Sequence, residues 1–142
     1  MLALSRAIVV LAIALLAPVA AQAASLAQQV KAAYASYDAA FNSGKPNAVA
    51  ALYTENAVLL PTSHDVLKGR AAIAKFDAGL FKAGIHSHKL ELIEANGNGD
   101  IIVAAARWSA TAKDGSTIGG VAVHEFVRRP NGSLKLRLHT FN

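Results

Sequence analysis

The sequence contains no cysteine. A disulfide framework, a thiolate nucleophile and a zinc or iron–sulfur centre held by cysteine are therefore excluded. Charged residues are also scarce, at 16% of the chain, and 14 Lys and Arg exceed 9 Asp and Glu only slightly. The basic residues are scattered along the chain, whereas nucleic-acid binding typically needs a clustered basic stripe. We therefore expect no nucleic-acid partner, and a length of 142 residues predicts one domain.

Hydrophobic residues make up 54% of the chain and are concentrated at its start. Residues 1–23 contain Arg6, an apolar run over 7–17 and the small-residue sequence Ala21-Gln22-Ala23. This pattern is typical of a secretory signal peptide. An uncleaved membrane anchor is the alternative, but the apolar run is much shorter than the roughly 20 residues that a span needs. We expect cleavage after Ala23, a periplasmic or secreted protein, and a mature domain over 24–142 that makes no membrane contact.

Three helices are expected in the first half of the mature chain. Ser25 and Gln28 form a capping-box pattern, after which apolar residues recur at helical spacing as far as Phe41. Pro46 suits the first turn of a short helix that reaches about residue 52, and a strand is expected over 57–60. A third helix is predicted over 70–83, after Gly69.

The second half of the chain alternates between apolar and polar residues, as strands do. Four strands are predicted over 86–95, 101–112, 117–129 and 133–141. The sequences between them, Asn96-Gly97-Asn98-Gly99, Asp114-Gly115 and Asn131-Gly132, favour hairpin turns. The whole order predicts an α+β fold with helices on one face of a curved, mainly antiparallel sheet.

Two-residue turns at Asp114-Gly115 and Asn131-Gly132 would fix the strand register. That register places His124 opposite His139, and Arg107 opposite Ala122. One face then carries mostly apolar residues, namely Trp108, Val121, Val123, Val127, Leu134, Leu136 and Leu138, with Glu125 among them. The other face carries Arg107, Ser109, Ala122, His124, Phe126, Arg137, His139 and Phe141. Simple patterning puts the apolar face in the core and the polar face in water, and that interpretation requires no function.

Several segments in this order are similar to those of one known superfamily. They are Tyr53–Pro61, Lys68–Ile73, Arg107-Trp108, Arg128–Leu134 and Thr140–Asn142. The mature chain resembles the SnoaL-like, nuclear-transport-factor-two-like superfamily, particularly its ketosteroid-isomerase-like and SgcJ/EcaC-type members. The resemblance implies a cone-shaped fold in which three N-terminal helices pack on a curled sheet around a pocket.

The resemblance also reverses the simple assignment of the two sheet faces. It implies that the pocket side holds the ligand-binding residues, which we predict to be Tyr37, Arg107, Ser109, His124, Arg137, His139 and Phe141. The apolar face then lies outside, where a patch of that size would be covered by a second copy of the chain. We therefore expect a homodimer formed through Trp108, Val121, Val123, Leu136 and Leu138.

The resemblance to ketosteroid isomerases implies a carboxylate base and two donors to a developing oxyanion. Tyr37 matches the family's oxyanion tyrosine, and His124 matches the second donor. The position of the base falls at Leu60 or Pro61, and neither residue can take a proton. Steroid isomerisation by the family mechanism is therefore not expected.

Three hypotheses for the pocket stay open. The favoured one is binding, without turnover, of a small, partly apolar and anionic molecule, because Arg107 and Arg137 can hold a carboxylate. The second is an isomerase, lyase or hydrolase that uses His124 or His139 as base and Tyr37 as oxyanion donor. The third is a ligand-free assembly domain whose cone is filled by Phe126 and Phe141.

Metal and cofactor sites are not indicated. His86 and His88 would share one strand face, but no third ligand can be identified, and histidines at strand ends are commonly solvated. The glycine-rich segment 96–99 does not join a strand to a helix, so it predicts a turn and no nucleotide site. We expect neither a metal nor a cofactor, and a small molecule as the ligand.

Overall fold

The structure, a computed structural model, describes residues 24–142. The expected leader, 1–23, lies outside the described residues. Helix α1 spans Leu26–Asn42, α2 spans Pro46–Ala50 and α3 spans Gly69–Lys82. None of the helices in this part of the chain has the length and apolar character needed to cross a membrane.

Helix α1 begins at the expected capping box. The backbone N–H of Gln28 donates to Oγ of Ser25, and the side-chain oxygen of Gln28 accepts from the backbone N–H of Ser25. The two residues thus satisfy one another's free groups at the helix start. The buried residues of α1 recur every three or four positions and so form one face, which consists of Val30, Tyr34, Tyr37 and Phe41.

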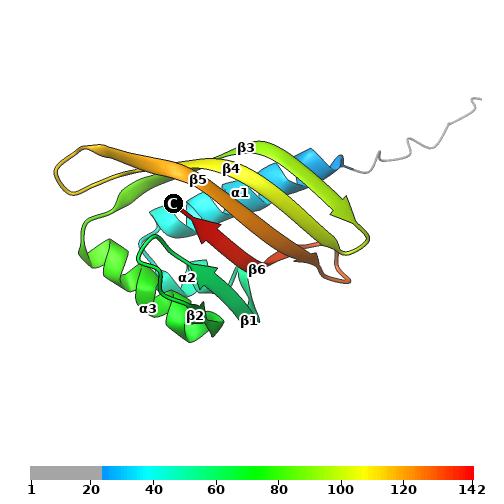
Figure 1. The fold of residues 1–142 in the computed structure, drawn as a ribbon, viewed down its shortest axis with the longest axis horizontal. Helices are drawn as coiled ribbons and strands as arrows, with labels where there is room; N and C mark the ends of the chain where they lie inside the picture. The colour runs from blue at the N-terminus through cyan, green and yellow to red at the C-terminus, as the bar shows by residue number, and fades with distance from the viewer. Residues whose placement is uncertain (1–23) are drawn as a thin grey trace, which may run out of the picture.

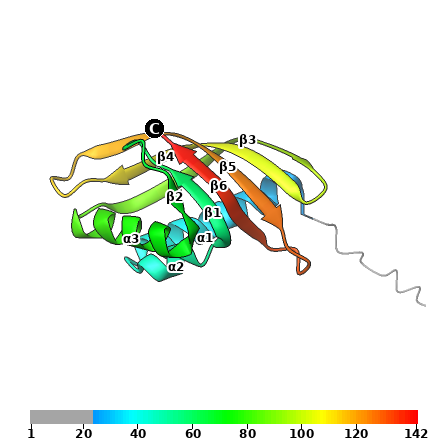
Figure 2. The same ribbon diagram turned by 60° about the horizontal axis from the view of Figure 1, so that its bottom comes forward.

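Six strands form one sheet in the order β2-β1-β6-β5-β4-β3. Their bounds are Tyr53–Leu60 (β1), Leu67–Lys68 (β2), His86–Asn98 (β3), Ile101–Thr111 (β4), Thr117–Arg128 (β5) and Leu134–Phe141 (β6). Strand β1 runs parallel to β6, and the other neighbours are antiparallel. Figure 1 shows the long strands crossing over α1, and Figure 2 shows the curved sheet arching over the three helices.

This arrangement confirms the predicted α+β cone with helices on the concave side of the sheet. Three elements differ from the prediction. Strand β3 was expected to end at residue 95 but continues to Asn98, through most of the segment that was expected to form a turn. Strand β1 begins at Tyr53, earlier than expected, and the short strand β2 was not predicted. β2 pairs with β1 through Leu67 and Lys68, next to the start of α3. A strand of two residues is too short to show the alternation by which strands are identified in a sequence.

The register between β4 and β5 differs from the prediction by one residue. Thr111 pairs with Thr117, and the backbone N–H of Ala112 donates to the carbonyl of Ser116 at 2.9 Å. The connection therefore has three residues, with Gly115 in the left-handed conformation at φ 84°. Glycine takes this conformation readily, and three-residue hairpins place it there. A shift of one residue moves every side chain of β4 to the opposite face relative to the prediction.

The hairpin between β5 and β6 also has a three-residue connection, but a bulge then corrects the register. Phe126 pairs with Leu136, whereas Glu125 pairs with Leu138, so that Arg137 is an extra residue in β6. Beyond the bulge the predicted pairing of His124 with His139 is confirmed. A bulge of this kind turns the side chains of the bulged strand to new directions.

Candidate functional site

A cavity of about 250 Å³ lies between α1, α3, the segment after β1 and the inner face of the sheet. Small residues of β4, Ala104, Ala106 and Ala110, face inward here and leave room between the sheet and the helices. Most of the lining is apolar or aromatic. The polar side chains of the lining are Tyr37 from α1, Thr62 and Ser63 from the segment after β1, Asp77 from α3, His88 from β3, Trp108 from β4 and His139 from β6.

His88 is held by a carboxylate. Its Nδ1 donates a hydrogen bond to Oδ1 of Asp38 at 2.8 Å, and the backbone N–H of Leu90 donates to the other oxygen of Asp38 at 3.1 Å. Because the carboxylate fixes the ring proton on Nδ1, Nε2 is the nitrogen that can accept a proton. His88 lines the cavity, and its side chain is only 10% exposed. The pair thus places a histidine, held by a carboxylate, in the wall of a mostly apolar cavity.

The backbone around His88 is fixed as well. The side chain of Asn42, the last residue of α1, accepts from the N–H of His88 at 2.7 Å and donates to its carbonyl at 2.9 Å. The preceding residue, Ser87, has φ 54°, and the pairing of β3 with β4 is irregular between His86 and Lys89. Positive φ is uncommon outside glycine, and such strained residues cluster at functional sites.

A second group of polar side chains joins two residues of the cavity lining, Tyr37 and His139, through the buried Tyr53. The hydroxyl of Tyr53 and Nδ1 of His139 share a hydrogen bond of 2.6 Å. The hydroxyls of Tyr37 and Tyr53 lie 3.4 Å apart, which is long for a bond between two oxygens. Burial raises the pKa of both tyrosines, and burial lowers the pKa of His139 well below its usual range. Both hydroxyls therefore keep their protons.

His124 lies beside His139 and is neutral as well. The ring centroids of the two histidines are 4.4 Å apart, and the hydroxyl of Tyr34 shares a hydrogen bond of 2.9 Å with Nδ1 of His124. Burial lowers the pKa of His124 to about 3. Its Nε2 is buried without a partner among the described residues. A base enclosed in this way takes up protons poorly, because the charged ring would lose its hydration.

Asp77 is the buried carboxyl group of the cavity. The residue is 2% exposed, and Oδ2 has no hydrogen-bond partner among the described residues. Burial raises the pKa of Asp77 to about 7. An isolated carboxylate is costly in such a place, so the group holds its proton far more readily than an exposed aspartate does.

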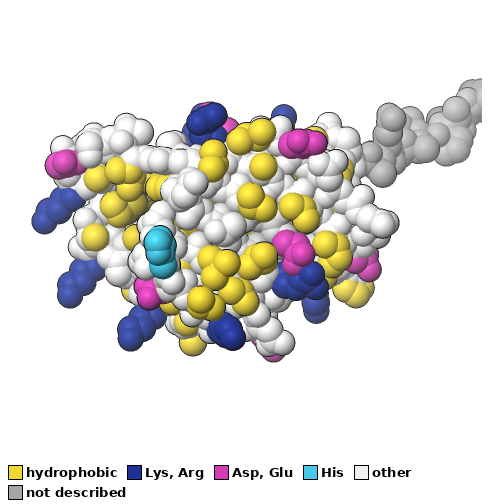
Figure 3. Space-filling model, viewed as in Figure 1, with side chains coloured by type: hydrophobic (Ala, Val, Ile, Leu, Met, Phe, Trp, Pro, Cys, Tyr) yellow, Lys and Arg dark blue, Asp and Glu magenta, His cyan; other side chains and the backbone are white. Residues whose placement is uncertain are grey.

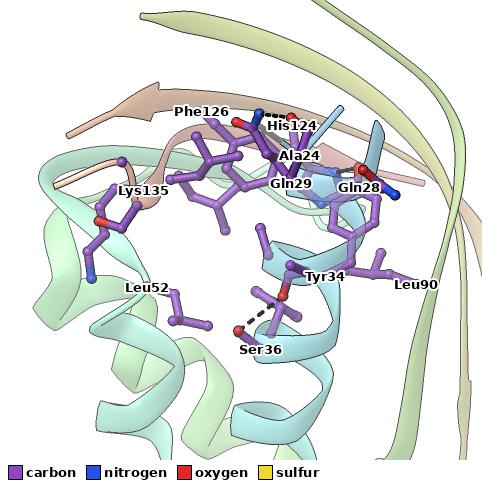
Figure 4. A pocket seen from close by; sticks show the side chains of 17 residues that line it. Ala24, Gln28, Gln29, Tyr34, Ser36, Leu52, Leu90, His124, Phe126 and Lys135 are labelled. Atoms are coloured by element: carbon purple, nitrogen blue, oxygen red, sulfur yellow. Dashed lines mark hydrogen bonds between the residues drawn. The ribbon is translucent and has the colours of Figure 1, made fainter. Parts of the chain in front are cut away.

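A second, larger cavity of about 420 Å³ lies toward the N-terminal half of α1 (Figure 4). Tyr34 and Ser36 reach it from α1, while Leu52 and Lys135 line it from another side. Its polar side chains at the start of α1, Gln28 and Gln29, bond within the protein, to Ser25 and to Ala24 and Arg128 respectively. This cavity lacks the Asp38–His88 pair, so the smaller cavity is the candidate site for chemistry.

Comparison with known families identifies one match. The SnoaL-like domain matches residues 33–135, which is more than half of the chain. The chain belongs to the SnoaL-like family. The resemblance of the sequence to this family is therefore confirmed. A comparison of this SnoaL-like chain with curated proteins gave no match.

Solved structures share the fold of this SnoaL-like domain. A domain of unknown function with a cystatin-like fold from Nostoc punctiforme has a TM-score of 0.71 at 17% identity, covering 84% of this chain and 78% of that one. A ketosteroid isomerase-like protein from Erwinia carotovora atroseptica has a TM-score of 0.66 at 20% identity, covering 80% and 92%. An NTF2-like protein from Novosphingobium aromaticivorans has a TM-score of 0.62 at 21% identity, covering 81% and 79%. At these identities the likeness concerns the fold alone.

Four of the sequence-predicted site residues lie inside the SnoaL-like cone. Tyr37, His139 and Phe141 line the smaller cavity, and Tyr37 also lines the larger one together with His124. Pro61, at the family's base position, lines the smaller cavity and offers no proton acceptor. The roles of these residues in binding or catalysis stay predictions.

The expectation that Arg107, Ser109 and Arg137 face the pocket is wrong. Arg107 pairs with Val121 and is exposed on the outer face, and Ser109 lies two positions further along the same face. Arg137 is the bulge residue of β6, and its Nε donates to Glu125 on that outer face. The cause is the three-residue connections, which shift the register by one. Neither cavity is therefore lined by an arginine.

The predicted outer face is also partly wrong. Trp108 faces inward, where its ring contacts Phe141 at a centroid distance of 5.6 Å, and Leu136 is buried at 3% exposure. Val121 and Val123 do lie outside, each 42% exposed, with Val103 beside them at 44%, and Leu138 is half-buried opposite Glu125. Figure 3 shows hydrophobic side chains in separate groups on the face it displays, with charged side chains between them.

Three residues of the site, Asp38, Asp77 and His88, were not predicted as site residues from the sequence, and the side chain of His88 is largely buried where a solvated strand-end histidine was expected. Asp77 follows Ile73 by four positions on α3 and so lies on the helix face that packs inward, a signal that periodicity alone could have given. Asp38 gave no such signal, because its partner His88 is fifty positions away. Over residues 24–142, no three His, Asp or Glu side chains are grouped as metal ligands would be.

Proposed function

We propose that this SnoaL-like domain is an enzyme that abstracts a proton from a carbon next to a carbonyl group, in an isomerase or lyase reaction. The observation that carries the proposal is the Asp38–His88 pair at the wall of an enclosed cavity. This is the second of the three hypotheses, with His88 in place of His124 or His139 as the base.

His88 is the better base for a physical reason. A catalytic base has to be neutral, accessible to the substrate and stabilised when it takes up the proton. Asp38 lies 2.8 Å from Nδ1 of the His88 ring, where its carboxylate can stabilise the charge that the ring gains when Nε2 takes up a proton. His124 and His139 have no carboxylate partner among the described hydrogen bonds, and burial lowers the pKa of both.

Tyr37 supplies the stabilising donor. When Nε2 of His88 takes the proton, the electron pair of the C–H bond moves toward the carbonyl oxygen, which becomes an enolate oxygen. Tyr37 lines the same cavity, and its hydroxyl has only a long contact of 3.4 Å to Tyr53. A hydrogen bond to the enolate oxygen in a low-dielectric site is a strong source of transition-state stabilisation.

The substrate that fits this cavity is small, neutral and mostly apolar. The cavity of about 250 Å³ is lined largely by aliphatic and aromatic side chains, and no Lys or Arg of the described residues lines it. The hypothesis of an anionic ligand depended on Arg107 and Arg137 and loses its support because both are exposed on the outer face. The hypothesis of a filled cone is disfavoured by the two cavities that remain beside Phe126 and Phe141.

The test is hydrogen exchange at carbon. A panel of enolisable ketones is incubated with the mature protein in D₂O, and the loss of protons next to the carbonyl is followed by NMR. We expect exchange for small apolar ketones and a loss of about 100-fold or more in His88→Gln, the range in which acid–base groups contribute. His86→Gln is the matched control, since His86 is exposed on the same strand. Exchange that is absent, or that persists in His88→Gln, contradicts the proposal.

Export and a homodimer through the outer face belong to the proposal as well. The leader sequence of residues 1–23 supports export, and the exposed valines of β4 and β5 support a covered outer face. The intact mass of the protein recovered after export is expected to lack the first 23 residues.

A further inference from the structure

Asp77 is a buried carboxyl group that neither the fold nor the proton abstraction by His88 explains. It replaces an apolar residue on the inner face of α3, one position after Phe76 and three before Leu80. Buried polar groups are nearly always hydrogen-bonded, and Oδ2 of Asp77 has no partner among the described residues. A packing role would be filled better by leucine, so the carboxyl group itself needs an explanation.

The surroundings of Asp77 favour its protonated form. It lines the same cavity as Tyr37, His88 and His139, and no Lys or Arg of the described chain lies in that lining to balance a negative charge. Both Tyr37 and Tyr53 lie close enough for the charge of Asp77 to raise their pKa. The cavity thus contains a proton acceptor on β3 and a proton donor on α3.

We propose that Asp77 is the general acid of the site, and that the reaction is the elimination of water from a small, neutral β-hydroxy ketone. This inference depends on the proposed function, because it takes His88 as the base. A 1,3-proton shift can be performed by one group that takes a proton and returns it. A separate group in the opposite protonation state is what an elimination requires, since one proton leaves carbon while another is added to oxygen.

The step balances as follows. Nε2 of His88 takes the proton from the carbon next to the carbonyl, and the C–H electron pair forms an enolate whose oxygen accepts from Tyr37. The electron pair then returns from the enolate oxygen and forms the carbon–carbon double bond. The bond between the β-carbon and its hydroxyl oxygen breaks, Asp77 adds its proton to that oxygen, and water leaves. The protein ends with a protonated His88 and an ionised Asp77, and transfer of one proton between them through solvent restores it.

The experiment uses one ketone with two readouts. The β-hydroxy ketone formed from acetone and benzaldehyde exchanges its central protons in D₂O, which NMR detects, and loses water to a conjugated enone, which absorbs in the ultraviolet. We expect Asp77→Asn to lower the rate of water loss about 100-fold or more, and by at least about tenfold more than it lowers the rate of exchange. Asp100→Asn, in an exposed turn, is the matched control and should change neither rate.

A second probe separates proton donation from a structural role. The same ketone with a nitrophenoxide in place of the hydroxyl group needs no acid, because nitrophenoxide leaves as a stable anion. Asp77→Asn should therefore eliminate nitrophenoxide at nearly the wild-type rate. Asp77→Ser tests the same point if the asparagine variant does not fold.

The outcomes distinguish a failure of the proposed function from a failure of the proposed role of Asp77. Exchange that does not depend on His88 overturns the proposed function itself. Exchange that depends on His88, together with no water loss or with water loss that survives Asp77→Asn, overturns only the role of Asp77. Loss of exchange and of both eliminations in Asp77→Asn shows a structural role and also overturns it.

Discussion

The carboxylate of Asp38 on α1 accepts a hydrogen bond of 2.8 Å from Nδ1 of His88 on β3. Helix and strand are also joined at Asn42, whose side chain bonds both backbone groups of His88. The orientation of the imidazole therefore depends on how α1 packs against the sheet. The contacts of His88 with Asp38 and Asn42 therefore serve both the proposed proton transfer and the packing of α1 on the sheet.

Asp38→Asn should impair catalysis while leaving the fold intact. An amide can still accept from Nδ1, but it carries no charge to stabilise the imidazolium that forms during proton transfer. We expect carbon exchange to fall about 100-fold or more, with the melting temperature changed much less than in a core substitution. Asp65→Asn in an exposed loop is the control. A rate equal to that of the wild type would show that His88 acts without Asp38.

Removal of the Asp77 charge should stabilise the protein at neutral pH. Burial raises the pKa of Asp77 from 3.8 to about 7, so the folded chain binds this proton more tightly than the unfolded chain does. The stabilisation that comes from this tighter proton binding is fully present below about pH 4 and is lost as the pH rises to about 7. In urea unfolding, the free energy of unfolding of Asp77→Asn relative to that of the wild type should rise by up to about 4 kcal/mol between about pH 4 and pH 7. A difference that stays constant with pH would contradict the raised pKa.

His124 should have the opposite dependence on pH. Burial lowers its pKa from 6.5 to about 3, so the unfolded chain binds the proton more tightly. The stabilisation that the neutral His124 provides is fully present above about pH 6.5 and is lost as the pH falls toward 3. His124→Gln should therefore lose less stability on acidification than the wild type, as measured by urea unfolding over this range. His64→Gln, on an exposed loop, should follow the wild-type curve.

Gly120→Ala should destabilise the sheet. A Cβ at this position would lie 1.9 Å from the carbonyl oxygen of Asn142, so the backbone would have to shift. We expect a loss of about 1–3 kcal/mol in the free energy of unfolding. Gly79→Ala in α3 is the matched control, because nothing lies within 4 Å of its added Cβ. That variant should gain about 0.5–1 kcal/mol from its higher helix propensity.

The proposed homodimer predicts a charge-sensitive outer face. Val121→Lys with Val123→Lys would place two charges on residues that are each 42% exposed on β5. We expect this double variant to be monomeric by analytical ultracentrifugation, because charge is depleted at the centres of interfaces. Val66→Lys is the control, since Val66 is 60% exposed in the segment before β2. A wild-type protein that sediments as a monomer contradicts the dimer.

The fold could be predicted from the sequence because its signals are local. The capping box at Ser25, the periodic apolar face of α1 and the glycine turns each depend on a few neighbouring residues. These signals were sufficient for the order of the elements other than β2. The predicted pairing of His124 with His139 holds because the bulge at Arg137 offsets a connection one residue longer than expected.

The site could not be predicted as well, because it depends on single-residue differences in connection length. Lys113-Asp114-Gly115 forms a three-residue connection where two residues were expected, and this alone moves Arg107 outward and Trp108 inward. The three-residue connection before β6 has the same effect on Leu136, and the bulge at Arg137 then restores the predicted register. The Asp38–His88 contact joins residues fifty positions apart, and such distant contacts have no local pattern in a sequence.

Tyr37 and Leu90 each line both cavities, so these two side chains form a shared wall. A movement of either side chain that enlarges one cavity changes the shape of the other. We therefore expect occupation of the larger cavity to alter the position of the Tyr37 ring, whose centroid lies 5.3 Å from that of His88. Any such influence has to act equally in both directions, because the coupling free energy between two binding sites is reciprocal. We therefore expect a molecule bound in one cavity to change the affinity of the other.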